Sequence, residues 1–277
     1  MRLIRLSLRI SRAFGIQMKS RDFGFQRRWH ASLARGIASI DRKDLKMKIL
    51  ITSGGTKIPI DLVRSITNMS RGTFGSKICD MFYKTTPIDT EITFMHAKDS
   101  RMPGLFQTMG PAIKPVRTIE YKTFDDYRNA ITGLLSEEKF DIICLAAAVS
   151  DYGVEQVFNG KYRSRDDEMV IKLVKLPKVI SDVRRLNPDA MLCGFKLLVN
   201  STDEELRSAM DRQFEENSID ICVGNDLRDI KANDHRLTLK NRFEDKFAVY
   251  TKHSCDLPKK VVYECMRVWK MKTGKIA

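Results

Sequence analysis

Two short loops rich in glycine and hydroxyl residues are the first features of this sequence that could do chemistry. One is the segment 53–56 (SGGT), which follows an apolar run, and the other is the segment 68–75 (NMSRGTFG). Glycines let backbone N–H groups approach a phosphate, and the N-terminus of a following helix adds a favourable dipole. Each loop alone is ambiguous, because such residues also form ordinary turns and helix caps. Neither loop matches a Walker A motif or a complete G-x-G-x-x-G fingerprint.

Two charged residues further along the chain are also candidates. Asp151 ends the segment 146–151 (AAAVSD), whose small residues would let a flat ring pack closely. Its carboxylate could accept hydrogen bonds from a ribose or hold water around a cation, although capping of the next turn would normally be the favoured interpretation. Lys161 lies in a cluster of charged residues, and its position alone predicts a solvated surface residue.

The elements that must position these residues alternate between strands and helices. This alternation predicts an α/β fold, a doubly wound, mostly parallel Rossmann-like sheet with helices on both faces. Ligands of such sheets bind outside the carboxyl ends of the strands, where the candidate loops lie. Residues 153–175 break the alternation, and we expect a flap or hairpin excursion there. The expected strands are 48–52, 91–96, 116–119, 141–149, 190–195 and 219–224, the expected helices are 73–84, 125–137, 202–217 and 257–271, and 235–239 with 247–250 would form a terminal hairpin.

The charge of +14 is concentrated at the N-terminus. Residues 1–46 hold 12 Lys/Arg and three acids, a net charge of +9, which leaves +5 for the other 231 residues. The first segment has the composition of a mitochondrial presequence, or it precedes a true start at Met47. We expect a disordered basic extension over 1–46 and a single domain over 47–277. The mildly basic domain suits phosphorylated small molecules and gives little reason to expect a nucleic-acid partner.

Cysteine spacing and hydropathy exclude other classes of protein. The six cysteines show no C-x-x-C pair and no zinc-site spacing, so we expect reduced thiols, most of them buried, and no direct protein ligands to a metal. No apolar run approaches the ~20 residues of a membrane-spanning helix. We therefore expect a cytoplasmic protein without a membrane partner, or a mitochondrial one if residues 1–46 are a presequence.

Taken in order, these motifs resemble the phosphopantothenate–cysteine ligase family, also called phosphopantothenoylcysteine synthetase. The resemblance covers residues 47–270, and each motif is weak alone while the ordered series is specific. The segments 149–152 (VSDY) and 195–199 (FKLLV) look most like those of the stand-alone bacterial ligases. The motifs are 51–56 (ITSGGT), 59–64 (PIDLVR), 66–68 (ITN), the glycine-spaced 70–75, 147–152 (AAVSDY), 173–180 (LVKLPKVI), 194–197 (GFKL) and 225–226 (ND).

The resemblance implies a two-step ligation in coenzyme A biosynthesis. The carboxylate of 4′-phosphopantothenate attacks the α-phosphate of a nucleoside triphosphate, pyrophosphate leaves, and the amine of L-cysteine then displaces the nucleoside monophosphate from the acyl nucleotide. CTP is the favoured co-substrate and ATP the alternative, with Mg²⁺ carried by the nucleotide. The resemblance also implies a homodimer whose active sites are completed near the subunit boundary.

The same resemblance assigns roles to residues. The catalytic set is Lys161, Asn68 and Arg64, in which Lys161 neutralises the reacting anions, Asn68 holds the acyl nucleotide and Arg64 shapes its loop. The nucleotide set is Ala146, Ala147, Asp151, Lys161, Pro177, Lys178, Val179, Ile180 and Phe195. The substrate and phosphate set is Ser53, Gly54, Gly55, Asn68, Ser70 and Gly72.

Two departures from the family pattern concern cations. The family motif Lys-x-Lys-Lys reads Lys161-Tyr162-Arg163-Ser164 in this chain, so one cation is kept as arginine and one is lost. Gln213 and Asn217 stand nearest to the positions of two lysines that reach the nucleotide in fused members of the family.

Two other functions fit parts of the sequence. An NAD(P)-dependent oxidoreductase shares the fold class but requires the complete glycine fingerprint, which is absent. A nucleic-acid-binding module would use the basic N-terminus, yet no recognition motif accompanies that charge.

Overall fold

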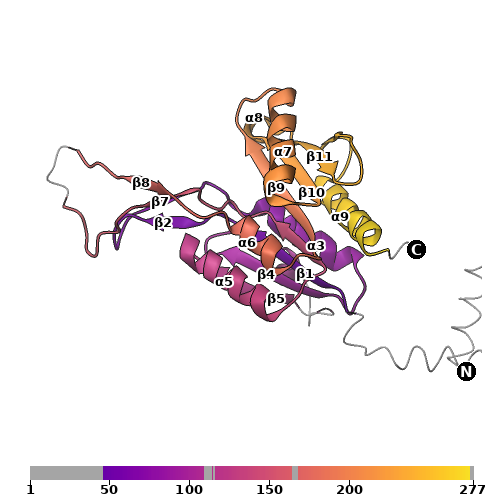
Figure 1. Cartoon of the computed structure of the whole chain (residues 1–277), viewed down its shortest axis with the longest axis horizontal. Helices are drawn as coiled ribbons and strands as arrows, with labels where there is room; N and C mark the ends of the chain where they lie inside the picture. The colour runs from indigo at the N-terminus through magenta and orange to yellow at the C-terminus, as the bar shows by residue number, and fades with distance from the viewer. Residues whose placement is uncertain (1–45, 109–113, 115, 164–167, 275–277) are drawn as a thin grey trace, which may run out of the picture. The chain divides into compact units, whose positions relative to one another are not determined.

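The structure is a computed structural model that describes residues 46–108, 114, 116–163 and 168–274 (Figure 1). Met47–Ala277 form one compact unit. The predicted basic extension over 1–46 lies outside the described residues, apart from Lys46, and so do the last residues of the predicted domain.

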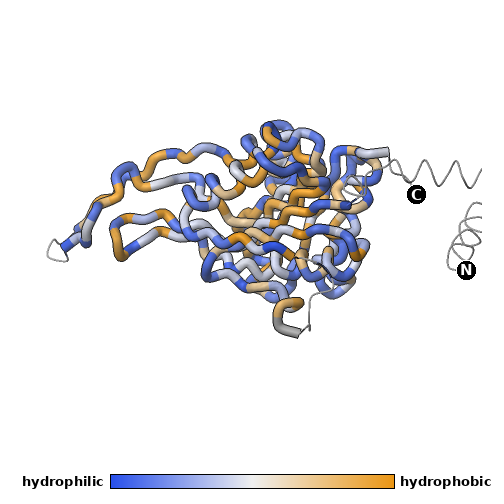
Figure 2. The backbone as a smooth tube through the Cα atoms, turned by 90° about the horizontal axis from the view of Figure 1, so that it is seen from below, coloured by the Kyte–Doolittle hydropathy of each residue, from blue (hydrophilic) through white to orange (hydrophobic). Residues whose placement is uncertain are grey.

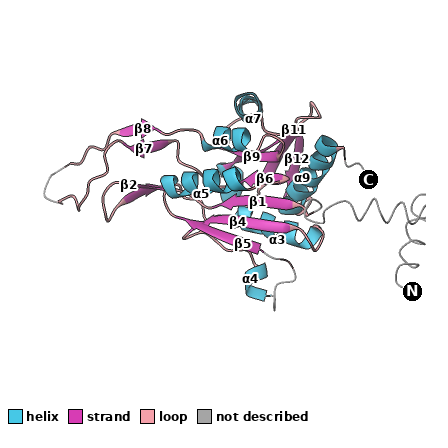
Figure 3. Ribbon diagram, turned by 60° about the horizontal axis from the view of Figure 1, so that its bottom comes forward, coloured by secondary structure: helices cyan, strands magenta, loops and turns pink. Residues whose placement is uncertain are grey.

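A parallel sheet forms the centre of the unit (Figures 1 and 3). In the described part of the chain, eight strands pair in the order β12-β11-β10-β9-β6-β1-β4-β5. The six parallel strands, numbered along the chain, lie in the order 3-2-1-4-5-6, which is the doubly wound order of Rossmann folds. The parallel strands are β1 Lys48–Ser53, β4 Glu91–Ala97, β5 Val116–Tyr121, β6 Ile142–Leu145, β9 Met191–Leu198 and β10 Ile221–Asp226, and the antiparallel edge is β11 Arg236–Asn241 with β12 Ala248–Thr251.

Helices cover both faces of this sheet, as the sequence predicts (Figure 3). Successive residues of β1 enter different cores, because side chains alternate between the faces of a strand. Ile49 and Ile51 pack with helices α3 (Thr73–Thr85) and α9 (Leu257–Thr273). Leu50 packs with the opposite cluster, to which α5 (Phe124–Glu137), α6 (Val179–Leu186) and α7 (Asp203–Asn217) contribute. Figure 2 shows these hydrophobic residues along the strands in the interior.

Local signals set the boundaries of two helices on the second face. Thr123 caps α5 and Thr202 caps α7, and each forms a reciprocal capping box with the acid three residues later, Asp126 or Glu205. The predicted helix 202–217 therefore begins one residue later than expected, because Thr202 is the cap itself.

The predicted strand 141–149 is wrong in its extent. β6 ends at Leu145, and the chain then continues to Ala148, which forms an isolated bridge with Gly55 of the loop after β1. The two hydrogen bonds of this bridge, and not a continued ladder, hold the segment in place.

The predicted excursion is confirmed as a hairpin, β7 (Tyr152–Val154) with β8 (Leu173–Lys175). A second hairpin, β2 (Lys57–Pro59) with β3 (Ser65–Thr67), was not predicted. Figure 1 shows β2 and β7–β8 extending away from the sheet on the same side. Three short helices were not predicted either, because their apolar patterns span too few residues to show a helical period. They are α4 (Leu105–Thr108), α6 and α8 (Leu227–Lys231).

Candidate functional site

The site begins where the strand order reverses, between β1 and β6. In doubly wound sheets this switch point opens a crevice at the carboxyl ends of the strands. Here the loop after β1 crosses the crevice and pairs with Ala148. The amide N–H of Ala148 donates to the carbonyl oxygen of Gly54 at 2.7 Å, and the amide of Thr56 donates to the carbonyl oxygen of Ala148 at 3.2 Å. We call the residues Gly54–Thr56 with Ala148 the partition.

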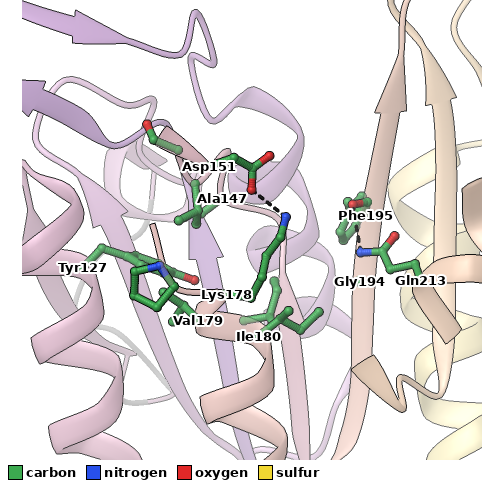
Figure 4. Close-up of a pocket in the computed structure, with 13 residues that line it drawn as sticks. Tyr127, Ala147, Asp151, Lys178, Val179, Ile180, Gly194, Phe195 and Gln213 are labelled. Atoms are coloured by element: carbon green, nitrogen blue, oxygen red, sulfur yellow. Dashed lines mark hydrogen bonds and ion pairs between the residues drawn. The ribbon is translucent and has the colours of Figure 1, made fainter. Parts of the chain in front are cut away.

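A first cavity of about 150 Å³ lies beside the partition, against β6, β9 and α6 (Figure 4). Its apolar walls and the Phe195 side chain suit a flat ring, and Gly194 lets Gln213 pack closely, because a Cβ at that position would lie 3.2 Å from Gln213 Nε2. Residues that line the cavity are Tyr127, Leu145, Ala147, Val149, Ser150, Asp151, Pro177, Lys178, Val179, Ile180, Gly194, Phe195 and Gln213.

Polar groups stand at two edges of this cavity (Figure 4). The Lys178 ammonium lies 2.5 Å from the Asp151 carboxylate, and both side chains are more than half exposed, so the pair adds little to stability and can open toward a ligand. On the other side, Gln213 donates from Nε2 to the Phe195 carbonyl oxygen at 3.4 Å. Burial raises the pKa of Tyr127 to about 12, so this phenol stays neutral.

A second cavity of about 430 Å³ lies near the loop that precedes α3. Asn68 links it to the partition, because its side-chain amide donates to the Ala148 carbonyl oxygen at 2.8 Å. Four cations and one acid line this cavity, and the acid, Asp99, is ion-paired with Lys57. The lining residues are Gly55, Lys57, Thr67, Asn68, Met69, Ser70, Arg71, Ala97, Lys98, Asp99, Ser100 and Lys122.

Three predicted phosphate-binding residues lie in neither cavity. Ser53, Gly54 and Gly72 are buried, and Ser53 Oγ donates to the Gly72 carbonyl oxygen at 2.9 Å. Gly54 and Gly72 have φ angles of 93° and 69°, a backbone region that favours glycine. A Cβ at either position would lie within 3.0 Å of Ser100 Cβ. These residues bring the loops together and form the start of α3, which has no side-chain cap.

A buried carboxylate, Asp61, joins the β2–β3 hairpin to the flap. It accepts hydrogen bonds from the Arg64 guanidinium at 2.8 and 3.0 Å and from the Tyr162 amide at 3.1 Å. Burial would raise its pKa, but the backbone N–H groups of Arg64 and Val63 and the Arg64 side chain together hold that pKa well below its usual range. Arg64 also donates to the Tyr162 carbonyl oxygen at 3.0 Å, so it positions the segment that carries Lys161.

The structure thus brings most of the predicted nucleotide set together. Seven of its members line the first cavity, while Ala146 and Lys161 line neither cavity, and the Lys161 side chain is exposed. Gly55, Asn68 and Ser70 line the second cavity. Sequence reasoning missed Tyr127, Leu145, Val149, Ser150 and Gly194 as lining residues. The flanks of the small-residue motif could have suggested Val149 and Ser150, whereas Tyr127 lies on a helix whose apolar face looked like ordinary core.

The prediction of reduced, largely buried cysteines is confirmed for the described chain. All six cysteines are free, and all but Cys255 are buried. Cys144, Cys193 and Cys265 place their sulfur atoms within 4.8 Å of one another, the one group of three metal-ligating side chains among the described residues. They lie inside the apolar core on the α3–α9 face and not at either cavity. No helix of the described residues is both long and apolar enough to cross a bilayer.

Comparisons with known proteins agree with this architecture. Residues 45–263 match the model of the DNA/pantothenate metabolism flavoprotein C-terminal domain. The chain is 32% identical over 220 residues to the coenzyme A biosynthesis bifunctional protein CoaBC of Thermococcus kodakarensis. The aligned region covers 79% of this chain and 51% of that protein. It is 31% identical over 180 residues to the coenzyme A biosynthesis bifunctional protein CoaBC of Methanocaldococcus jannaschii, and the aligned region covers 65% of this chain and 40% of that protein. The chain spans about half or less of these relatives.

Solved structures show the same fold. A DNA/pantothenate metabolism flavoprotein from Streptococcus pneumoniae superimposes with a TM-score of 0.67 at 26% identity, covering 82% of this chain and 99% of that one. A Cab2 mutant in complex with phosphopantothenate-cysteine superimposes with a TM-score of 0.69 at 16% identity, covering 96% and 99%.

Proposed function

We propose that this chain, which belongs to the DNA/pantothenate metabolism flavoprotein C-terminal domain family, ligates 4′-phosphopantothenate to L-cysteine in coenzyme A biosynthesis. The observation that carries the proposal is that both cavities adjoin the partition. Ala147 and Val149, which flank Ala148, line the first cavity, and Gly55 and Asn68 line the second, with the Asn68 amide bonded to Ala148. Such an arrangement gives a nucleotide and an acid separate entrances to one reaction point. The names of the relatives and of the Cab2 complex supply the substrate class.

The nucleoside occupies the first cavity. Its base packs against Phe195 and Ile180, and its ribose hydroxyls bond to Asp151 after the exposed pair with Lys178 opens. We favour CTP over ATP, because the motifs resemble those of the stand-alone bacterial ligases, for which the resemblance implies CTP.

The reaction proceeds at the partition in two steps. A carboxylate oxygen of phosphopantothenate attacks the α-phosphorus, the bond to the β-phosphate oxygen breaks, and pyrophosphate leaves. The cysteine amine then attacks the acyl carbon, the nucleoside monophosphate leaves and the amine loses a proton. The Asn68 amide, which already donates to Ala148, would donate to the acyl nucleotide between the steps.

The first step brings anions together and needs cations. Asp151 is the one carboxylate that lines the first cavity within the described residues, and it is paired with Lys178, so the residues present suit a Mg²⁺ carried on the phosphates and not on the protein. Bound in that way, Mg²⁺ would neutralise phosphate charge. Lys161 would supply the remaining positive charge.

Lys161 must reach the cavity from elsewhere, and we propose that it does so in a homodimer. Large apolar side chains on the hairpins and adjoining loops are unusually exposed, including Leu62 at 73%, Met69 at 90% and Val170 at 88%. Exposed apolar patches mark surfaces that a partner covers. A second copy packed here would carry its own flap to this cavity.

Co-expression of two inactive variants tests this arrangement. Lys161→Gln and Asn68→Asp chains, each of which completes little or no ligation alone, should together recover about a quarter of wild-type turnover, because a random mixture contains half heterodimers with one intact site each. If Lys161 serves the cavity of its own chain, no heterodimer has an intact site and no activity returns. Product mass should equal that of phosphopantothenoylcysteine, and failure of the wild type to form it with either CTP or ATP would refute the proposed function.

A further inference from the structure

We propose that the second cavity recognises the phosphate group of the acid substrate through Lys98, Lys122 and Arg71. This inference rests on the proposed function and adds a specificity site to it. Lys98 and Lys122 belong neither to the motifs that define the resemblance nor to the nucleotide cavity, and Arg71 occupies an unspecified position of the motif 70–75.

The charge of the cavity is the first argument. Lys57, Lys98, Lys122 and Arg71 line it together with the single acid Asp99. Asp99 forms an ion pair with Lys57. The hydrogen bond from Lys57 is the main cause of the lowered pKa of Asp99, and the nearby charges of Lys98 and Lys122 lower that pKa further. Within the described ranges, no ion pair involves Lys98, Lys122 or Arg71. A phosphomonoester carries a charge of about −1.5 to −2 at neutral pH, which this excess of positive charge matches.

Polar groups of the wall give a second argument. Ser100 lines the cavity, and its hydroxyl is a buried oxygen without a hydrogen-bond partner among the residues described. Gly55 and Asn68 line the same cavity and belong to or touch the partition, so one end of a bound molecule meets the reaction point.

The shape of the substrate fits this layout. A molecule with a carboxylate at one end and a phosphate at the other can place the carboxylate beside Asn68 and the phosphate among the lysines. An acid without the phosphate would lose its contacts in the cavity but none at the partition. The cavity would therefore select phosphorylated acids and leave the chemistry of the carboxylate unchanged.

The competing assignment is that these cations hold the triphosphate of the nucleotide. The first cavity contains the apolar walls for a base, and none of the four cations of the second cavity lines it. The two assignments predict different kinetic changes, which allows one variant to separate them.

The test is the double variant Lys98→Gln/Lys122→Gln, compared with Lys84→Gln. Lys98 and Lys122 are exposed, so their replacement should leave the fold intact. Lys84 is an exposed lysine in the last turn of α3, about 20 Å along the helix from its N-terminal loop. The double variant should raise the KM for phosphopantothenate about tenfold and leave kcat and the KM values for CTP and cysteine unchanged. Turnover of unphosphorylated pantothenate should be equal in the wild type, the double variant and the Lys84→Gln control.

An unchanged KM for phosphopantothenate in the double variant, or an equal rise in the KM for CTP, would overturn the inference. Calorimetric titration with phosphopantothenate alone keeps the test independent of turnover, with about tenfold weaker binding expected in the double variant. Equal binding by the double variant and the Lys84 control would also overturn it. A wild-type protein that binds phosphopantothenate but forms no product would refute the proposed function and not this site.

Discussion

Replacement of Asp220 by asparagine should destabilise the protein and loosen the first cavity. This carboxylate is fully buried and lies 2.8 Å from Arg184 of α6, 2.7 Å from Arg242 and 3.1 Å from Lys272 of α9. It also accepts the backbone N–H of Leu192 at 2.9 Å. Asp220 therefore fastens α6, whose first residues line the cavity, to the sheet and to α9.

The size of the effect follows from these contacts. Removal of one partner from a buried ion pair costs ~3–5 kcal/mol, and the partial exposure of Arg184, Arg242 and Lys272 reduces this to about 2–4 kcal/mol. For a domain of this size, each kcal/mol shifts Tm by ~2–4 °C, so we expect a decrease of about 10 °C. Thermal unfolding followed by circular dichroism measures it. The control is Asp245→Asn, since Asp245 is fully exposed and lies 3.3 Å from Lys240.

The pH dependence gives the prediction its sign. Burial would raise the pKa of Asp220, but the Leu192 amide, Arg184 and Lys272 lower it below its usual value. A carboxyl group with a lowered pKa in the folded state stabilises above its unfolded pKa of ~3.9, and that contribution is lost as the pH falls through the folded value. The Tm difference between wild type and Asp220→Asn should thus be constant from pH 8 to about 5 and shrink below about pH 4. Equal Tm values for the variant and the Asp245 control at pH 7 would refute this reasoning.

Three further changes concern the flap and the partition. Lys161→Gln should abolish pyrophosphate release without a change in Tm, whereas Lys172→Gln on the same hairpin should keep activity; an active Lys161 variant would remove this residue from the mechanism. Asn68→Asp should slow the cysteine step more than activation, so that mass spectrometry detects a trapped acyl nucleotide; normal turnover with none detected would contradict the role of Asn68. Asp61→Asn should undock the flap and speed hydrogen exchange at the Tyr162 amide, and unchanged exchange would show that this carboxylate does not hold the flap.

The periodic parts of the fold could be predicted from the sequence, because burial on one or both faces leaves a pattern in the chain. Segments such as 73–84 and 202–217 carry an apolar face over several turns, and the helices formed there. The helix α6 could not be predicted in this way, because its eight residues are too few to show a helical period. Its role depends on Arg184 and Asp220, which are 36 residues apart in sequence. Contacts of that kind leave no local signal.

The candidate site also contains some residues that the sequence could predict and others that it could not. Asp151 follows β6, and Phe195 lies in β9 just beyond the last residue paired with β6, so the rule for doubly wound sheets brings these two together, and both line the first cavity. Gly54 and Gly72 of the glycine-rich loops are closely packed and line neither cavity, so their role in phosphate binding stays a prediction. A sequence motif cannot separate these two uses of glycine. The lysines of the second cavity come from three separate segments and could be found only from coordinates.

The most direct test of the central claim, that activation at the partition precedes the entry of cysteine, is a pre-steady-state measurement of pyrophosphate release. Enzyme at a concentration comparable to that of its substrates would be mixed with CTP and phosphopantothenate in the absence of cysteine, with ATP in a parallel sample. The account predicts a burst of about one pyrophosphate per active site, followed by steady turnover only when cysteine is added. Pyrophosphate release that begins only after cysteine is added would contradict it.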